Sequence, residues 1–184
     1  MSVGAEGGST FNGIQDLSTP YGKVHRIYDD GSIPAENPFY GQEDIIASIY
    51  TYGHRSPQGL EFNYFNGELY GTEHGPRGGD EINHLIPGRN YGWPLTSLCM
   101  DYDGTRVEYG RELGITFELA DIEQAGVDLT PSLAVSGFVI MDSGQFPQWQ
   151  GHLLAGSLKA RSLFRFVIDK NGLIHRENLL KGFA

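Results

Sequence analysis

The sequence predicts an all-β fold made of repeated four-stranded antiparallel units, which is the pattern of a β-propeller. Glycine is abundant at 26 residues and aromatic residues make up 12% of the 184-residue chain, a composition typical of short strands and many turns. Alternating segments, each followed by a glycine-bearing turn, recur as KVHRIYDDGSI from Lys23, EINHLIPGRNYG from Glu81 and SLFRFVIDKNGLI from Ser162. Asn66-Gly67 separates two further alternating segments, which predicts a type I′ hairpin.

The repeats predict a single domain over residues 1–184 that forms part, roughly half, of a propeller. Neither end shows the capping repeat that a complete repeat protein is expected to carry. Residues 95–130 interrupt the rhythm and are interpreted as a long insertion, with a short helical piece near 120–125. A plain β-sandwich is the alternative, because short strands can resemble one another by chance.

Composition excludes several classes of protein. The formal net charge of −10 argues against nucleic-acid binding, which needs a basic face. No apolar stretch approaches the roughly 20 residues of a membrane-spanning helix, and the first residues carry no secretory signal pattern. Cys99 is the only cysteine of the sequence, which excludes an internal disulfide and a cysteine-based metal site.

The stretch EHGPRGGDEIN, residues 73–83, combines acids with glycines and a proline. Glycines at 75, 78 and 79 permit backbone conformations closed to other residues, and Pro76 holds Gly75 extended. Successive carbonyl oxygens can then turn toward one ion, and Ca²⁺ prefers six to eight such oxygens together with carboxylates. The loop therefore predicts a Ca²⁺ site, and an acidic loop without an ion is the alternative.

Three motifs, YGHRSPQGLEF, TEHGPRGGDEIN and PGRNYGWP, resemble the glucose/sorbosone dehydrogenase family, the soluble aldose sugar dehydrogenases that depend on pyrroloquinoline quinone (PQQ). The segments QDLSTPYGKVHRI, PSLAVSGFVIMDS and GSLKARSLFRF extend the resemblance across nearly the whole chain. The resemblance implies a six-bladed propeller with PQQ and Ca²⁺ over its central channel. Family members are roughly twice as long as this chain.

The resemblance also implies metal ligands. The carbonyls of Gly75 and Pro76 would contact the Ca²⁺ that bridges to PQQ. Asp80 and Glu81, with the backbone near Tyr91, resemble a second, structural Ca²⁺ site.

The cofactor contacts implied by the resemblance are Arg55, Ser56 and Lys159, in addition to Gly75 and Pro76. A guanidinium suits planar anionic oxygens, which fits Arg55. Ser56 departs from the asparagine usual in the family. Neither His54 nor His74 is assigned a catalytic role, because the base of the family lies upstream of the motifs present here, so no catalytic residue is predicted in this chain.

The function implied is oxidation of the anomeric hydroxyl of an aldose to a lactone, with electrons passing to a separate acceptor, in the periplasm or outside the cell. This chain alone is expected not to turn over sugar. A noncatalytic, Ca²⁺-stabilised propeller that binds a protein or a glycan is the alternative. Exposed apolar blade faces near Val24 and Ile27, and near Leu163 and Phe166, would allow a homodimer to close the ring.

Overall fold

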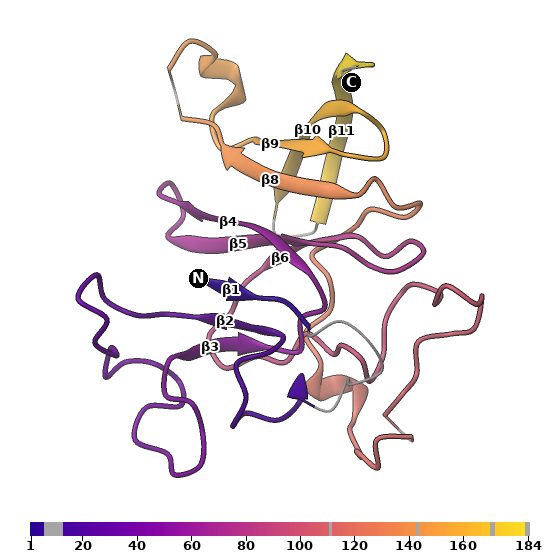
Figure 1. The fold of residues 1–184 in the computed structure, drawn as a ribbon. Coiled ribbons are helices and arrows are strands. Elements are labelled where there is room, and N and C mark those ends of the chain that lie inside the picture. Colours follow the sequence, from indigo (N-terminus) through magenta and orange to yellow (C-terminus); the bar gives the residue numbers. More distant parts are fainter. Residues whose placement is uncertain (6–12, 111, 143, 170–171, 183–184) are drawn as a thin grey trace. The chain divides into compact units, whose positions relative to one another are not determined.

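The computed structural model describes residues 1–5, 13–110, 112–142, 144–169 and 172–182. Its strands form three antiparallel sheets, and Figure 1 labels most of these strands. The first sheet contains β1 (Ser2–Val3), β2 (Lys23–His25) and β3 (Ile49–Tyr52). The second contains β4 (Pro57–Asn63), β5 (Glu68–Glu73), β6 (Glu81–His84) and β7 (Val127–Asp128). The third contains β8 (Val135–Ile140), β9 (Leu153–Ser157), β10 (Ser162–Asp169) and β11 (Gly172–Lys181).

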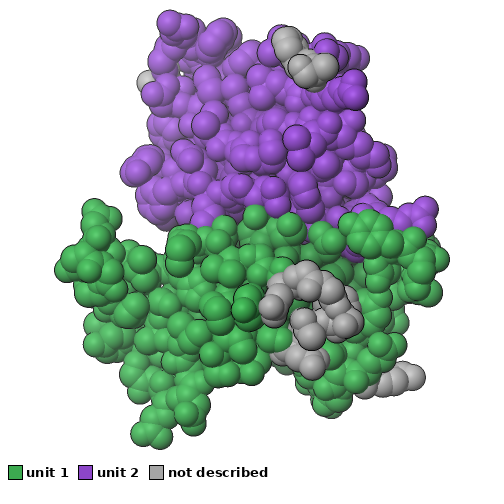
Figure 2. All heavy atoms as spheres, viewed as in Figure 1, with its two compact units in different colours: residues 1–57, 85–124 green, residues 58–84, 125–184 purple. Residues whose placement is uncertain are grey.

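The chain divides into two compact units (Figure 2). Unit 1 contains residues 1–57 and 85–124, and unit 2 contains residues 58–84 and 125–184. Within the predicted insertion the structure has the short 3₁₀ helix η2 (Leu119–Asp121) and strand β7. A second 3₁₀ helix, η3 (Pro147–Trp149), precedes β9. In the described part of the chain no helix is long and apolar enough to cross a membrane.

Unit 2 buries an apolar core between its two four-stranded sheets. The alternation in β9 and β10 turns every second side chain inward, so Phe164 lies opposite Ala155 and Phe166 lies opposite Leu153. The buried members of this core are Ile82, Val127, Leu129, Val135, Phe138, Leu153, Ala155, Phe164 and Phe166. The period of two in the sequence therefore determines which face of each sheet is covered.

The predicted type I′ turn at Asn66-Gly67 is wrong. That turn needs positive φ at both residues, and only Gly67, with φ of 78°, has it. The connection is longer, because the amide of Gly67 donates to the carbonyl of Asn63 at 2.8 Å. The side chain of Asn63 accepts from the amide of Phe65 at 3.0 Å, which favours this wider turn.

The expected apolar faces are also partly wrong. Val24 and Phe166 are 2% and 0% exposed, and Phe166 belongs to the apolar core of unit 2. Ile27 is exposed, and Leu163 is half-buried. Closure of a ring by a second copy stays a prediction, and these two buried residues do not contribute to it.

Candidate functional site

The loop of residues 74–80 connects β5 to β6 in unit 2 and curls tightly on itself. A Cβ on Gly75 would lie 2.0 Å from the carbonyl oxygen of Gly78 and 2.7 Å from that of Gly79, so only glycine fits there. Gly78 and Gly79 have left-handed φ angles of 99° and 62°. The three glycines of the predicted ion-binding loop therefore form a compact turn in which Gly75 lies against the carbonyls of Gly78 and Gly79.

The carboxylate of Asp80 ties this loop to the segment before β8. Asp80 is fully buried, and both of its oxygens accept from the hydroxyl of Ser132, at 2.9 and 2.8 Å. It also accepts from the amides of Gly75, at 3.2 Å, and Val135, at 3.3 Å. These donors give the buried Asp80 side chain hydrogen-bond partners from three segments, so the structure gives Asp80 an anchoring role that the sequence did not predict.

Glu81 lies in a crowded group of oxygens. The strand register places it between Glu73 on β5 and Asp128 on β7. Burial raises the pKa of Glu81 well above its usual range, and the neighbouring Glu73 carboxyl raises it further. The amide nitrogen of Asn83 donates to Glu81 at 3.0 Å, while the buried oxygen Oδ1 of Asn83 has no hydrogen-bond partner.

This group fits the chemistry of Ca²⁺, which is implied by the resemblance. A hard cation would relieve the crowding of two carboxyls and use the orphaned Asn83 oxygen. Within the described ranges no cluster of three or more His, Cys, Asp or Glu side chains could hold a metal. The fit therefore depends on carboxamide and backbone oxygens beside Glu73 and Glu81.

Arg55, in unit 1, is held by aromatic side chains. Its guanidinium lies over the Trp93 ring, 5.4 Å from the centroid, and its Nη2 donates to the Tyr102 hydroxyl at 3.3 Å. The Arg55 carbonyl accepts from the amide of Ala5 at 2.7 Å. Ser56, which follows it, is half-buried. A guanidinium held by these contacts is suited to anionic oxygens, and its aromatic support was not predicted.

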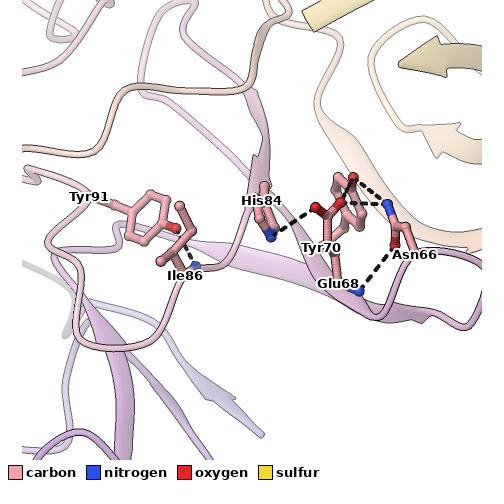
Figure 3. Close-up of polar contacts among 6 residues, drawn as sticks. All are labelled: Asn66, Glu68, Tyr70, His84, Ile86 and Tyr91. Atoms are coloured by element: carbon pink, nitrogen blue, oxygen red, sulfur yellow. Dashed lines mark hydrogen bonds and ion pairs between the residues drawn. The ribbon is translucent and has the colours of Figure 1, made fainter. Parts of the chain in front are cut away.

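Tyr91, also in unit 1, is a buried packing residue. Its hydroxyl accepts from the amide of Ile86 at 2.9 Å, and Figure 3 shows this contact. Its ring stacks on His54, with centroids 4.7 Å apart. His54 in turn bonds to the hydroxyl of Thr51 at 2.9 Å, so this histidine has structural partners on both sides.

Lys159 is exposed in the turn between β9 and β10 of unit 2. Its amide donates to the carbonyl of Leu133 at 3.2 Å, which fixes the turn while the side chain faces solvent. The predicted site residues therefore fall into one group per unit. Arg55, Ser56 and Tyr91 belong to unit 1, and Gly75, Pro76, Asp80, Glu81 and Lys159 belong to unit 2.

Sequence reasoning missed Glu73, Asn83 and Ser132. The register of two alternating strands around a tight loop could have placed Glu73 opposite Glu81. Ser132 lies 52 residues from Asp80, and nothing in the sequence pattern links the two.

Comparison with known proteins decides the family. The family model described as Glucose / Sorbosone dehydrogenase matches residues 1–184. The chain belongs to this family. The predicted resemblance is therefore confirmed.

Two curated relatives are similar in sequence. The chain is 41% identical to aldose sugar dehydrogenase YliI of Escherichia coli over 159 residues, which are 86% of this chain and 41% of that protein. It is 38% identical to quinoprotein glucose dehydrogenase B of Acinetobacter calcoaceticus over 122 residues, 66% of this chain and 25% of that one. The chain thus spans less than half the length of these relatives.

Solved structures of sugar dehydrogenases have a fold similar to that of this chain. A crystal structure of a glucose dehydrogenase matches with a TM-score of 0.87 at 32% identity, covering 98% of this chain and 50% of that one. The soluble aldose sugar dehydrogenase of Escherichia coli, in its apo form, matches with a TM-score of 0.85 at 35% identity, with the same coverage. The predicted fold class, all-β and part of a propeller of four-stranded antiparallel blades, is confirmed.

Proposed function

We propose that the chain is part of a PQQ- and Ca²⁺-dependent dehydrogenase that oxidises the anomeric hydroxyl of an aldose to a lactone. The observation that carries the proposal is the curled loop of residues 74–80 beside the buried Glu73 and Glu81 carboxyls. Two relatives support the activity by name, one as an aldose sugar dehydrogenase and one as a quinoprotein glucose dehydrogenase.

The residues of unit 2 hold the cations in this proposal. Carbonyls of Gly75 and Pro76 would hold the ion that serves the cofactor, and the Glu81 carboxylate would hold the structural ion. Asp80 supports both sites by fixing the loop through Ser132. Tyr91 contributes a backbone oxygen to the structural site, as the resemblance implies.

The cofactor contacts are the cationic and polar side chains. Arg55 and Lys159 bind anionic oxygens of the cofactor, and Ser56 adds a short hydroxyl contact. When bound, PQQ supplies the oxidant, and Ca²⁺ supplies Lewis acidity at its carbonyl. No residue of this chain is assigned as the base that removes the sugar hydroxyl proton. The same proposal includes a separate electron acceptor and a periplasmic or secreted location.

Calorimetric titration of the metal-free chain with Ca²⁺ tests the cation sites. We expect binding heat and a raised melting temperature, and Glu81→Gln should remove the part due to the structural site. Glu61→Gln, on β4 of the same unit, is the matched control and should bind as the unaltered chain does. The absence of both binding heat and a shift in melting temperature on addition of Ca²⁺ would refute the cation sites.

Titration with PQQ in the presence of Ca²⁺ distinguishes the dehydrogenase from a noncatalytic binding module. We expect saturable binding that Lys159→Ala and Arg55→Ala each weaken. Ca²⁺ binding without PQQ binding would favour the noncatalytic alternative. Ser56, which stands where the family usually has an asparagine, agrees with that alternative. Dye-linked oxidation of glucose by the loaded chain should not exceed the control without enzyme, because the base is expected outside this segment.

A further inference from the structure

Unit 2 contains a cavity of about 550 Å³ at the ends of β5 and β6 away from the loop of residues 74–80. β5 begins at Glu68 and runs to Glu73 at the loop, while β6 begins at the loop with Glu81 and ends at His84. Glu68 and His84 both line the cavity. Its volume is within the range of small-molecule pockets.

The polar wall of this cavity is held by its own hydrogen bonds, as Figure 3 shows. One carboxylate oxygen of Glu68 accepts from the Tyr70 hydroxyl at 2.6 Å and from the side-chain amide of Asn66. The backbone amide of Glu68 donates to the Asn66 side chain at 3.1 Å. Burial and the bond to Glu68 raise the pKa of Tyr70 to about 12, so the phenol remains a donor.

The second carboxylate oxygen of Glu68, Oε1, points toward His84 and not toward Tyr70 and Asn66. It faces Nε2 of His84 at 3.9 Å, which is longer than a hydrogen bond. The Glu68 and His84 side chains are 38% and 39% exposed. A hydroxyl group both donates and accepts, so it can bind the carboxylate and the imidazole at the same time.

The rest of the lining selects the class of ligand. Among the described residues the lining contains the acids Glu68 and Asp169 and no lysine or arginine, which disfavours anions. The described residues offer no cluster of three or more His, Cys, Asp or Glu side chains for a metal ion. The half-buried Ile168 supplies an apolar surface suited to the C–H face of a polyol.

We propose that this cavity binds a neutral polyhydroxylated molecule of the size of a monosaccharide, with Glu68 and His84 bound to its hydroxyl groups. Tyr70 and Asn66 act as positioning residues that fix the Glu68 carboxylate. The site goes beyond the proposed function, because it is at the opposite end of these strands from the loop and uses none of the cofactor residues.

The test uses the full chain without PQQ or Ca²⁺ and follows the His84 imidazole by NMR while glucose or myo-inositol is added. We expect saturable shifts of the His84 signals. Glu68→Gln should weaken binding about tenfold, because the bond to a charged acceptor is lost. Tyr70→Phe should weaken it less. Glu61→Gln, whose residue does not line the cavity, should leave it unchanged.

Melting curves of the variants will show whether each still folds, and the half-exposed Glu68 is expected to tolerate the change. Unmoved His84 signals at saturating probe, or equal affinity for the unaltered chain and Glu68→Gln, would overturn the proposal. Binding of choline without binding of either polyol would also overturn it, in favour of an organic cation. The Ca²⁺ and PQQ titrations report on other residues, so failure here leaves the proposed function intact.

Discussion

Unit 1 and unit 2 are each stabilised internally by different interactions. Among the described residues, unit 2 packs nine buried apolar side chains into one cluster. Unit 1 has a smaller buried apolar cluster, Ile14, Trp93, Cys99 and Val107, and relies on polar side chains that bond to its backbone. The contrast follows from strand content, since regular ladders satisfy backbone groups by themselves and irregular segments do not.

Lys23 shows how unit 1 is stabilised. Its side chain is fully buried, and its ammonium donates to the carbonyls of Gly13, Ile14 and Tyr21 at 3.1, 2.8 and 2.6 Å. Asn37 plays a similar part, donating to the carbonyls of two other segments, at Arg26 and Ala47. Outside the three-stranded sheet of this unit, buried polar side chains take the place of ladder bonds between strands.

Phe166→Ala should produce the largest effect, because Phe166 is fully buried at the centre of the unit 2 cluster. We expect a loss of about 4 kcal/mol in the free energy of unfolding, from lost burial and the cavity left behind. Urea denaturation followed by circular dichroism measures it. Phe65→Ala, at a position that is 51% exposed in the same unit, should cost less than about 0.5 kcal/mol. Equal losses for the two variants would contradict an apolar core in unit 2.

Lys23→Met should cost unit 1 about 3 kcal/mol, because it keeps the aliphatic stem but leaves three carbonyls without their donor. The same urea denaturation applies. Lys181→Met, at an exposed position, is the control and should be nearly neutral. A stable Lys23→Met variant would mean that these carbonyls find water, and that polar bonds do not hold unit 1.

A smaller effect should appear in the pH dependence of the unfolding free energy, through Lys23. Burial lowers the pKa of Lys23 from 10.5 to about 8. Between pH 8 and 10.5 the unfolded chain therefore holds a proton that the folded chain has released, so this residue's contribution to stability rises with pH in that window. The difference in unfolding free energy between the unaltered chain and Lys23→Met should grow from pH 8 to 10.5. A difference that shrinks over this range would show that Lys23 stays charged when folded.

The family and the strand pattern can be read from the amino-acid sequence alone. The alternation in 162–169 and the glycine-rich loop are local features, and local features are visible in one dimension. The need for glycine at 75 was also predicted, although its cause, close approach to the carbonyls of Gly78 and Gly79, was not. The type I′ turn failed because the side chain of Asn63, which lies before the Asn-Gly pair, favours a wider connection.

Only the tertiary structure decided what the polar side chains do. Asp80 was predicted as a Ca²⁺ ligand, which stays a prediction, and the structure adds bonds to Ser132 and Val135, far along the chain. Lys23 was part of a strand motif, yet its charge is buried among carbonyls. Glu68 and His84 drew no interpretation until strands β5 and β6 brought them to one cavity wall. Packing of distant segments sets the desolvation and the partners of a polar group, and these determine its role.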